Sequence, residues 1–574
     1  MKKVLIYLKY YKKETILAPL FKMLEASFEL FVPLVIASII DRGIEGEDKT
    51  HIWCMGGVLL LLGIIGLVCS VTAQYFSAKA ATGFASRLRA ELFSHIQKLS
   101  FSQLDKAGSA TLITRMTSDV NQVQSGVNLV LRLFLRSPFI VFGAMIMAFT
   151  VDVKAAFVFV VTIPLLSIVV FGIMLISIPL YKKVQLALDR VLGKTRENLS
   201  GIRVIRAFNK EEEELADFYV KNEELNKVQV FVGRFSALMN PVTYVIVNGA
   251  ILYLIWTGAW QVELGVLKQG EVVALVNYMS QILVELVKLA NLIITVTKAV
   301  ACGNRIEEVL KMQVENRQED IEFKEEYKEA VAFENVTFSY HKDAQPAVSD
   351  ISFVARKGET IGIIGGTGSG KSTLVNMLPG FYKPEEGKIY IDGVNVNAYE
   401  EGKLKAKIGM VMQKAVLFKG SIADNLKYGK EDATETEMWD ALAMAQAKEF
   451  VEKKEGGLSF VINEGGKNLS GGQRQRLTIA RALVKKPEIL VLDDSASALD
   501  YATDAALRKA LKETGDKQIT FIVSQRAASI MHADQIIVLD EGEMVGLGKH
   551  EELLKNCEVY QEIYHSQFRR EASV

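Results

Sequence analysis

The hydrophobic pattern divides the chain into two parts of different character. Six mostly apolar stretches occupy residues 15–42, 53–77, 129–151, 155–180, 236–260 and 272–299, and each is near the roughly 20 residues that a membrane-spanning helix needs. Residues 311–330 are charged, and beyond them short apolar strands alternate with helical stretches. The pattern predicts a six-helix membrane domain over residues 1–310, a linker over 311–330 and a soluble α/β domain over 331–574.

The connections between the apolar stretches alternate between short and long. The two long ones, residues 78–128 and 181–235, are rich in Lys and Arg, as is the start of the chain. Cytoplasmic loops carry an excess of these residues. We therefore expect a multi-pass protein of the cell membrane with both long connections, both termini and the soluble domain in the cytoplasm.

The long connections are predicted to be helical. Apolar residues recur at every third or fourth position over Phe84–Leu99, which indicates that the membrane helices continue into the cytoplasm. Short transverse helices are expected at the tips, near Ala110–Met116 and Gly201–Phe208. Gly108 and Gly201 are suitable breaks.

Ionisable residues interrupt the apolar stretches, among them Glu25, Glu29, Arg132 and Arg136. Charged side chains inside a span usually face the protein interior or a water-filled cavity. For Glu25 and Glu29 two interpretations stay open. They serve structure near the cytoplasmic interface, or they line a cavity that accepts cationic substrates.

Composition agrees with an apolar part joined to a soluble part. The chain has 574 residues, of which 50% are hydrophobic and 23% charged, and its mean hydropathy is +0.19. The formal net charge is zero, so charge gives no indication of a nucleic-acid partner. The four cysteines, Cys54, Cys69, Cys302 and Cys557, are too scattered to predict a zinc site or a redox pair.

A glycine-rich segment follows the apolar run 360–364 and precedes a helical stretch at 371–378. In this context backbone N–H groups surround phosphate oxygens, a lysine reaches the β- and γ-phosphates, and a hydroxyl coordinates Mg²⁺. Lys371 and Ser372 are the residues of these types. The pattern predicts a nucleotide-binding P-loop formed by Gly365, Gly366, Thr367, Gly368, Ser369, Gly370, Lys371, Ser372 and Thr373.

A second apolar run, residues 489–492, ends in Asp493. A carboxylate at the end of such a strand can hold Mg²⁺ beside a P-loop. Together with the runs at 360–364 and 519–523, this strand predicts a buried and largely parallel sheet.

Between the P-loop and Asp493 lies a third motif, Leu469-Ser470-Gly471-Gly472-Gln473. This sequence is the signature of ABC (ATP-binding-cassette) proteins, and the chain resembles one half of an exporter-type (type IV) ABC transporter over nearly its whole length. The resemblance implies a six-helix membrane domain, a P-loop ABC ATP-binding domain, and ATP hydrolysis coupled to transport with ATP and Mg²⁺ as cofactors. In the family this motif contacts the γ-phosphate bound to the opposite subunit, so two such chains are required.

Other positions also match the family pattern. Tyr340 resembles the aromatic residue that stacks on adenine, Gln413 the glutamine that senses Mg²⁺ and the membrane domain, and Asp500 the D-loop aspartate. The resemblance implies metal contacts from Ser372, Gln413 and Asp493. It also implies that the two transverse tips are coupling helices that press on the nucleotide domains.

Two positions depart from the family pattern. The family places a catalytic glutamate after Asp493, where this chain has Asp494, and a switch histidine where it has Gln525. Aspartate withdraws its carboxylate by about 1.5 Å relative to glutamate, and glutamine cannot shuttle a proton. We therefore expect the site containing Lys371 to bind ATP but to hydrolyse it slowly.

This asymmetry predicts a heterodimer. The signature of the chain is intact, so it can complete a competent site on a homologous half-transporter that supplies the glutamate and the histidine. The chain resembles the degenerate-site subunit of bacterial heterodimeric multidrug exporters. The expected function is export of drugs or other amphipathic compounds, with membrane lipid and a small amphipathic substrate as further partners and no nucleic acid.

Other functions on the same scaffold stay open. They are import of a siderophore-like or haem-like ligand and export of a lipid or a peptide. A non-transport ABC regulator or translation factor is disfavoured by the six apolar stretches.

Overall fold

The computed structural model describes residues 2–314, 323–341, 344–495, 498–513 and 518–568. They form two compact units, which are considered separately. The first comprises Met1–Lys98 and Gly108–Met312, and the second comprises Leu99–Ala107 and Gln313–Val574. Part of the predicted linker, residues 315–322, lies outside the described residues.

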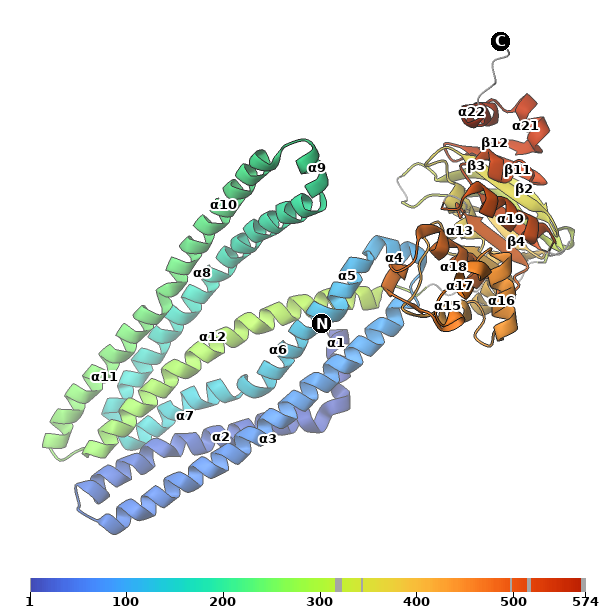
Figure 1. Ribbon diagram of the computed structural model, residues 1–574. Helices are drawn as coiled ribbons and strands as arrows, with labels where there is room; N and C mark the ends of the chain where they lie inside the picture. Colours follow the sequence, from blue (N-terminus) through green and yellow to red (C-terminus); the bar gives the residue numbers. More distant parts are fainter. Residues whose placement is uncertain (1, 315–322, 342–343, 496–497, 514–517, 569–574) are drawn as a thin grey trace. The chain divides into compact units, whose positions relative to one another are not determined.

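The first unit is built from helices (Figure 1). Within the described residues, six are long and apolar enough to cross a membrane: Lys3–Ile44, Lys49–Ile96, Ser109–Val151, Val153–Ser200, Glu211–Glu263 and Gln269–Lys311. Each contains one of the six predicted apolar stretches. Because a helix rises about 1.5 Å per residue, helices of 42 to 53 residues are roughly twice as long as a ~30 Å hydrocarbon core requires.

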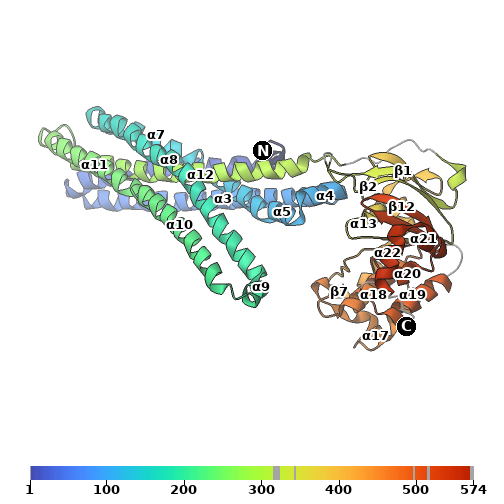
Figure 2. The same ribbon diagram turned by 90° about the horizontal axis from the view of Figure 1, so that it is seen from above.

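These long helices are divided by local changes of pitch or short breaks. Their parts are α1 (Lys2–Leu5), α2 (Lys12–Ser38), α3 (Lys49–Ile96), α5 (Ser109–Thr114), α6 (Val120–Leu133), α7 (Arg136–Val151), α8 (Val153–Ser200), α9 (Ile202–Ala207), α10 (Glu211–Ala237), α11 (Met239–Glu263) and α12 (Gln269–Lys311), with a 3-10 segment at Ile6–Tyr11 and π-helical segments at Ile39–Ile44 and Arg115–Asp119. Helices α2 and α3 lie side by side, as do α8 and α10, which α9 joins (Figures 1 and 2).

Short helices occur at both predicted positions. Helix α9 coincides with the expected helix near Gly201–Phe208, and α5 coincides with the one expected near Ala110–Met116. A further short helix that was not predicted, α4 (Phe101–Ala107), precedes Gly108. The break is at Gly108, whose φ of 74° is a conformation that favours glycine. Gly108 was predicted as a break, and it separates α4 from α5.

Packing within the first unit follows the rules of membrane helices. On α3 the large residues Leu60, Leu61 and Ile64 are exposed, whereas Ala73 and Ala80 are fully buried. Small residues let helix backbones approach closely, and lipid tails solvate the large side chains on the outside. The exposed apolar surface of this unit is therefore what a bilayer requires.

The second unit contains the predicted parallel sheet. Its strand order is β12-β11-β3-β10-β9-β6, and all neighbours are parallel except the β11–β12 pair at one edge. The strands are β3 (Thr360–Gly365), β6 (Ile408–Val411), β9 (Ile489–Asp493), β10 (Ile519–Val523), β11 (Gln535–Asp540) and β12 (Glu543–Gly548). The three apolar runs chosen from the sequence are the central strands β3, β9 and β10.

Two further sheets in this unit were not predicted. One is antiparallel with order β2-β1-β4-β5, and the other is the pair β7–β8. Their strands are β1 (Ala330–Phe338), β2 (Val348–Arg356), β4 (Glu386–Ile391), β5 (Val394–Asn395), β7 (Gly420–Ser421) and β8 (Val461–Ile462). The helices of the unit are α4, α13 (Lys371–Met377), α14 (Glu401–Lys407), α15 (Ile422–Lys427), α16 (Glu435–Met444), α17 (Lys448–Glu452), α18 (Gly471–Leu483), α19 (Tyr501–Glu513), α20 (Ala527–Ile530), α21 (His550–Asn556) and α22 (Glu558–Gln567).

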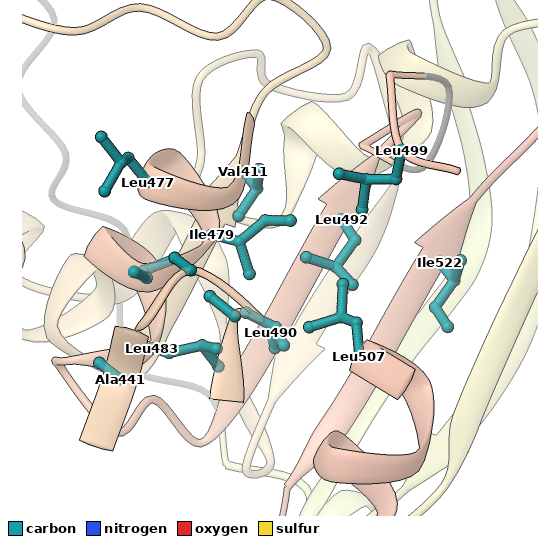
Figure 3. Packing of buried hydrophobic residues seen from close by; sticks show 14 of the residues in the cluster. Val411, Ala441, Leu477, Ile479, Leu483, Leu490, Leu492, Leu499, Leu507 and Ile522 are labelled. Atoms are coloured by element: carbon teal, nitrogen blue, oxygen red, sulfur yellow. The ribbon is translucent and has the colours of Figure 1, made fainter. Parts of the chain in front are cut away.

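A buried core fixes α18 against the central strand β9. Leu490 and Leu492 of β9 face Ile479 and Leu483 of α18, and Leu507 of α19 lies beside them (Figure 3). All five side chains are at most 5% exposed, and removing one such side chain typically costs about 2–5 kcal/mol. The core therefore holds the start of α18 in a fixed position relative to the end of β9.

Candidate nucleotide site

The functional residues converge because of the parallel sheet. Strands β3, β10, β9 and β6 are consecutive in the sheet, and ligands of such sheets bind beyond the carboxyl ends of the strands. A cavity of about 310 Å³ lies at this edge. It is lined by Tyr340, Ala347, Thr367, Gly368, Gly370, Lys371, Ser372, Thr373, Gln413, Asp493, Asp494, Val523, Ser524 and Gln525.

The P-loop is wrapped around its own lysine. The Lys371 ammonium donates to the carbonyl oxygen of Gly365 at 3.0 Å, to that of Gly366, and to the hydroxyl of Ser369 at 3.3 Å. Burial lowers the pKa of Lys371, although Asp494 and Asp493 oppose this effect. A buried cation held only by uncharged oxygens suits an anionic ligand, which would supply the missing negative charge.

The glycine at the end of the loop is required by its surroundings. Gly370 has φ 92°, and a β-carbon at this position would overlap the carbonyl oxygen of Ala347. The backbone can therefore turn into α13 only with glycine at this position.

Ser372 and Asp493 form a pair suited to a small divalent cation. The Ser372 hydroxyl donates to Asp493 Oδ1 at 2.9 Å, and burial raises the pKa of Asp493. The described residues contain no group of three or more His, Cys, Asp or Glu side chains that could hold a metal. Mg²⁺ does not need such a group, because it is commonly bound by one or two carboxylates together with substrate phosphates.

Asp494 occupies a constrained position beside this pair. Its φ is 46°, and its backbone N–H donates to the carbonyl oxygen of Val523 at 3.0 Å. Gln413 Nε2 donates to Asp494 Oδ2 at 3.4 Å, and burial raises the pKa of Asp494. The structure thus joins the residue after β9 with the glutamine that follows β6.

Gln525 lies in the loop after β10 and is exposed at the rim of the cavity. This loop is held by Gln567 of α22, whose amide donates to the Gln525 carbonyl at 2.6 Å and accepts from the N–H of Ala527 at 2.8 Å. Gln567 was not predicted from the sequence, because no motif marks it. Only the fold brings the C-terminal helix to this loop.

The aromatic residue Tyr340 is part of a connected set within the second unit. Its hydroxyl shares a hydrogen bond with that of Thr373 at 3.0 Å, and its ring meets the edge of Tyr382 at 5.3 Å. Tyr382 donates to Asp105 of α4 at 2.6 Å. Tyr382 and Asp105 were not predicted from the sequence, and their contact links the cavity wall to α4.

The signature segment lies outside the cavity, at the start of α18. Ser470 caps this helix, because its hydroxyl accepts from the N–H of Gln473 at 3.3 Å while the Gln473 side chain accepts from the N–H of Ser470 at 3.1 Å. Gly471 is exposed, and Leu469 is buried. The motif therefore does not line the cavity that contains this chain's own Lys371.

Asp500 is also outside the cavity. Its carboxylate accepts from the N–H of Thr503 at 2.7 Å at the start of α19, and this backbone hydrogen bond lowers the pKa of Asp500. Ser497, three residues before Asp500 in the sequence, lies outside the described residues.

Comparison with known proteins agrees with this architecture. Residues 15–286 match the ABC transporter transmembrane region, and residues 348–497 match the ABC transporter family. The uncharacterized ABC transporter ATP-binding protein YfiB of Bacillus subtilis (strain 168) is 37% identical over 573 residues, which cover 100% of both chains.

The chain belongs to the ABC transporter family. A second relative, the putative multidrug export ATP-binding/permease protein YgaD of Bacillus subtilis (strain 168), is 31% identical and covers 98% of both chains. A solved structure of a bacterial Atm1-family ABC exporter with ATP bound matches with a TM-score of 0.79 and 23% identity, over 98% of this chain and 99% of the other. That structure shows the shared exporter fold.

Family membership establishes the general activity. The protein is a multi-pass membrane half-transporter of the exporter type, with an ATP-binding domain that couples ATP hydrolysis to transport. Half-transporters of this kind generally act as dimers. ABC domains typically bind ATP with Mg²⁺, which agrees with the Ser372–Asp493 pair.

Proposed function

We propose that this chain is the slow half of a heterodimeric exporter of amphipathic compounds in the cell membrane. Its own P-loop site binds ATP with Mg²⁺ and hydrolyses it slowly, and its signature completes the competent site of a homologous partner. Both termini and the ATP-binding domain lie in the cytoplasm. The observation that carries the proposal is that Asp494 and Gln525 line the same cavity as Lys371.

The proposal rests on the position of the two substitutions. Asp494 follows the end of β9 and Gln525 follows the end of the neighbouring strand β10, where Val523 is in register with Asp493. This register supports the assignment of Asp494 to the general-base position and of Gln525 to the switch-histidine position of the family pattern. Loss of a positioned base costs about 10²–10⁴-fold in rate, whereas the groups that hold the nucleotide are kept.

Two observations support the other parts of the proposal. The name of YgaD describes that protein as a multidrug exporter, and an amphipathic compound is the corresponding substrate class for this chain. The basic residues of the helices that extend beyond the spans, such as Lys182, Lys183 and Arg190 of α8, support a cytoplasmic location of these extensions.

The heterodimer is tested by purifying this chain alone and with a homologous half-transporter encoded beside it. We expect Mg²⁺-dependent ATP hydrolysis only in the joint preparation. Changing the partner's catalytic glutamate to glutamine abolishes this activity, and Asp494→Asn leaves most of it. Rapid hydrolysis by this chain alone contradicts the proposal, because it would mean that Asp494 or another group acts as the base.

Adenine binding gives a second test at this chain's own site. We expect Tyr340→Ala to weaken photolabelling of this chain by 8-azido-ATP by about 5- to 150-fold, because stacking of a base on an aromatic ring contributes ~1–3 kcal/mol. Tyr382→Phe is the matched control, since it keeps the ring that packs on Tyr340 and removes only the hydrogen bond to Asp105. Equal labelling of native protein and Tyr340→Ala excludes the stacking role.

A further inference from the structure

An ion-pair cluster lies among the membrane helices of the first unit. Arg136, the first residue of α7, donates to Glu285 Oε1 of α12 and to Glu29 Oε2 of α2, both at 2.7 Å. Glu285 also accepts from the Ser137 hydroxyl at 2.7 Å and from Lys288 at 2.8 Å. Because Glu285 is buried and accepts these three hydrogen bonds, the Arg136–Glu285 pair is a satisfied structural contact.

Glu29 differs from Glu285 in its exposure. Its side chain is 41% exposed, whereas the side chain of Glu285 is 4% exposed. Arg136 occupies one oxygen of Glu29, and an ionised carboxylate offers about four acceptor positions in all. Glu29 therefore presents a negative charge, held in place by Arg136, toward open space in the membrane part of the chain.

The open space beside Glu29 has the form of a ligand pocket. A cavity of about 560 Å³ lies between α2 and α3, within the range of about 300–1,000 Å³ that is usual for small-molecule sites. Its walls include Phe28, Leu59 and Leu62. The α3 residues Gly63 and Gly66 also line it, and a β-carbon at either would meet no atom within 4 Å.

Charge decides the class of ligand. The charged residues that line this cavity are Glu25, Glu29 and Arg136, two negative and one positive. Arg136 is only 7% exposed and is already engaged by two carboxylates, and Glu25 is paired with Lys22 at 2.5 Å. The accessible charge is therefore the carboxylate of Glu29, which attracts a cation.

We propose that Glu29 and the glycine-lined cavity between α2 and α3 form a binding subsite for an amphipathic cation. The cationic group pairs with the free face of the Glu29 carboxylate, and the apolar body lies over Gly63 and Gly66 against Phe28, Leu59 and Leu62. Arg136 is a positioning residue that fixes the Glu29 side chain. This inference rests on the proposed export of amphipathic compounds and assigns a substrate class to it.

The subsite is tested by equilibrium binding without ATP, so the result does not depend on hydrolysis or on the assignment of the slow site. Ethidium fluorescence is titrated with the jointly purified transporter in lipid nanodiscs. We expect saturable binding that dodecyltrimethylammonium displaces and that dodecyl sulfate at the same sub-micellar concentration does not. Absence of ethidium binding, or preferential displacement by the anion, overturns the proposal.

Two variants approach the subsite from different helices. We expect Glu29→Gln to weaken ethidium binding by about 10- to 100-fold, because hydrogen bonds to charged groups contribute about 1.5–3 kcal/mol, and Glu29→Asp to retain part of it. Gly63→Leu should block the cavity without touching the ion pairs, since the space at this glycine is empty.

Glu224→Gln on α10, an exposed carboxylate in a 3.8 Å contact with Arg190, is the matched control. Native affinity in either folded variant, Glu29→Gln or Gly63→Leu, overturns the proposal.

Discussion

Asp494→Glu combined with Gln525→His is expected to raise ATP turnover at this chain's own site by about 10²–10⁴-fold, the usual contribution of a positioned general base. The reason is geometric. The cavity already holds Lys371, Ser372 and Asp493, so the groups that bind the nucleotide do not need to be rebuilt. What the native site lacks is a carboxylate that reaches one methylene farther and a side chain that can carry a proton.

Turnover at this chain's own ATP site is measured after hydrolysis at the partner's ATP site has been inactivated. The double variant is purified with a partner whose catalytic glutamate is changed to glutamine, and steady-state phosphate release is compared with that of the native chain in the same pairing. Adding Lys371→Ala to the double variant is the control, and it should remove the gained activity. Turnover no faster than that of the native pairing would show that other groups limit hydrolysis here.

Gly471→Asp in the signature is expected to lower turnover of the proposed heterodimer by at least about 100-fold, comparable with the loss of a group that stabilises transition-state charge. Gly471 is exposed at the first turn of α18, where N–H groups and the helix dipole favour an anion. A carboxylate at this position repels a phosphate brought by the partner. Because a β-carbon here meets no atom within 4 Å, the fold should tolerate the change.

The effect should be confined to the partner's site. Labelling of this chain by 8-azido-ATP should persist in Gly471→Asp, since the signature lies outside the cavity that contains Lys371. Gly402→Asp, at another exposed glycine with no atom within 4 Å of a β-carbon, is the matched control. Turnover unchanged in Gly471→Asp would exclude the role of this signature in the competent site.

The motifs were predictable because each is local in the sequence. A P-loop consists of a strand, a turn and the start of a helix within about a dozen residues. Its glycines indicate the tight turn, because they permit backbone conformations that other residues rarely adopt. The six spans were equally clear, since a long apolar run has few other structures available. The short helix near residue 110 could also be predicted, because Gly108 marks its start, whereas α4 before this glycine was not predicted.

The convergence of distant groups could not be read from the chain. Ser372 meets Asp493 and Gln413 meets Asp494 only because β3, β10, β9 and β6 are neighbours in one parallel sheet. The hydrogen bond from Gln567 of α22 to the carbonyl of Gln525 also depends on the tertiary fold, because the two residues are far apart in the sequence. A pattern along the sequence specifies which face a strand buries, but it does not specify which strand becomes its neighbour.

The sequence alone determined the family, the six spans, the P-loop, the signature and the two substitutions, because each of these features is formed by residues that are close together in the sequence. Only the tertiary structure decided that Glu285 is a buried partner of Arg136 while Glu29 keeps a free face. Both are glutamates in apolar helices, and their composition does not distinguish them. What separates them is the packing of α2, α7 and α12, which removes one carboxylate from solvent and leaves the other beside a cavity.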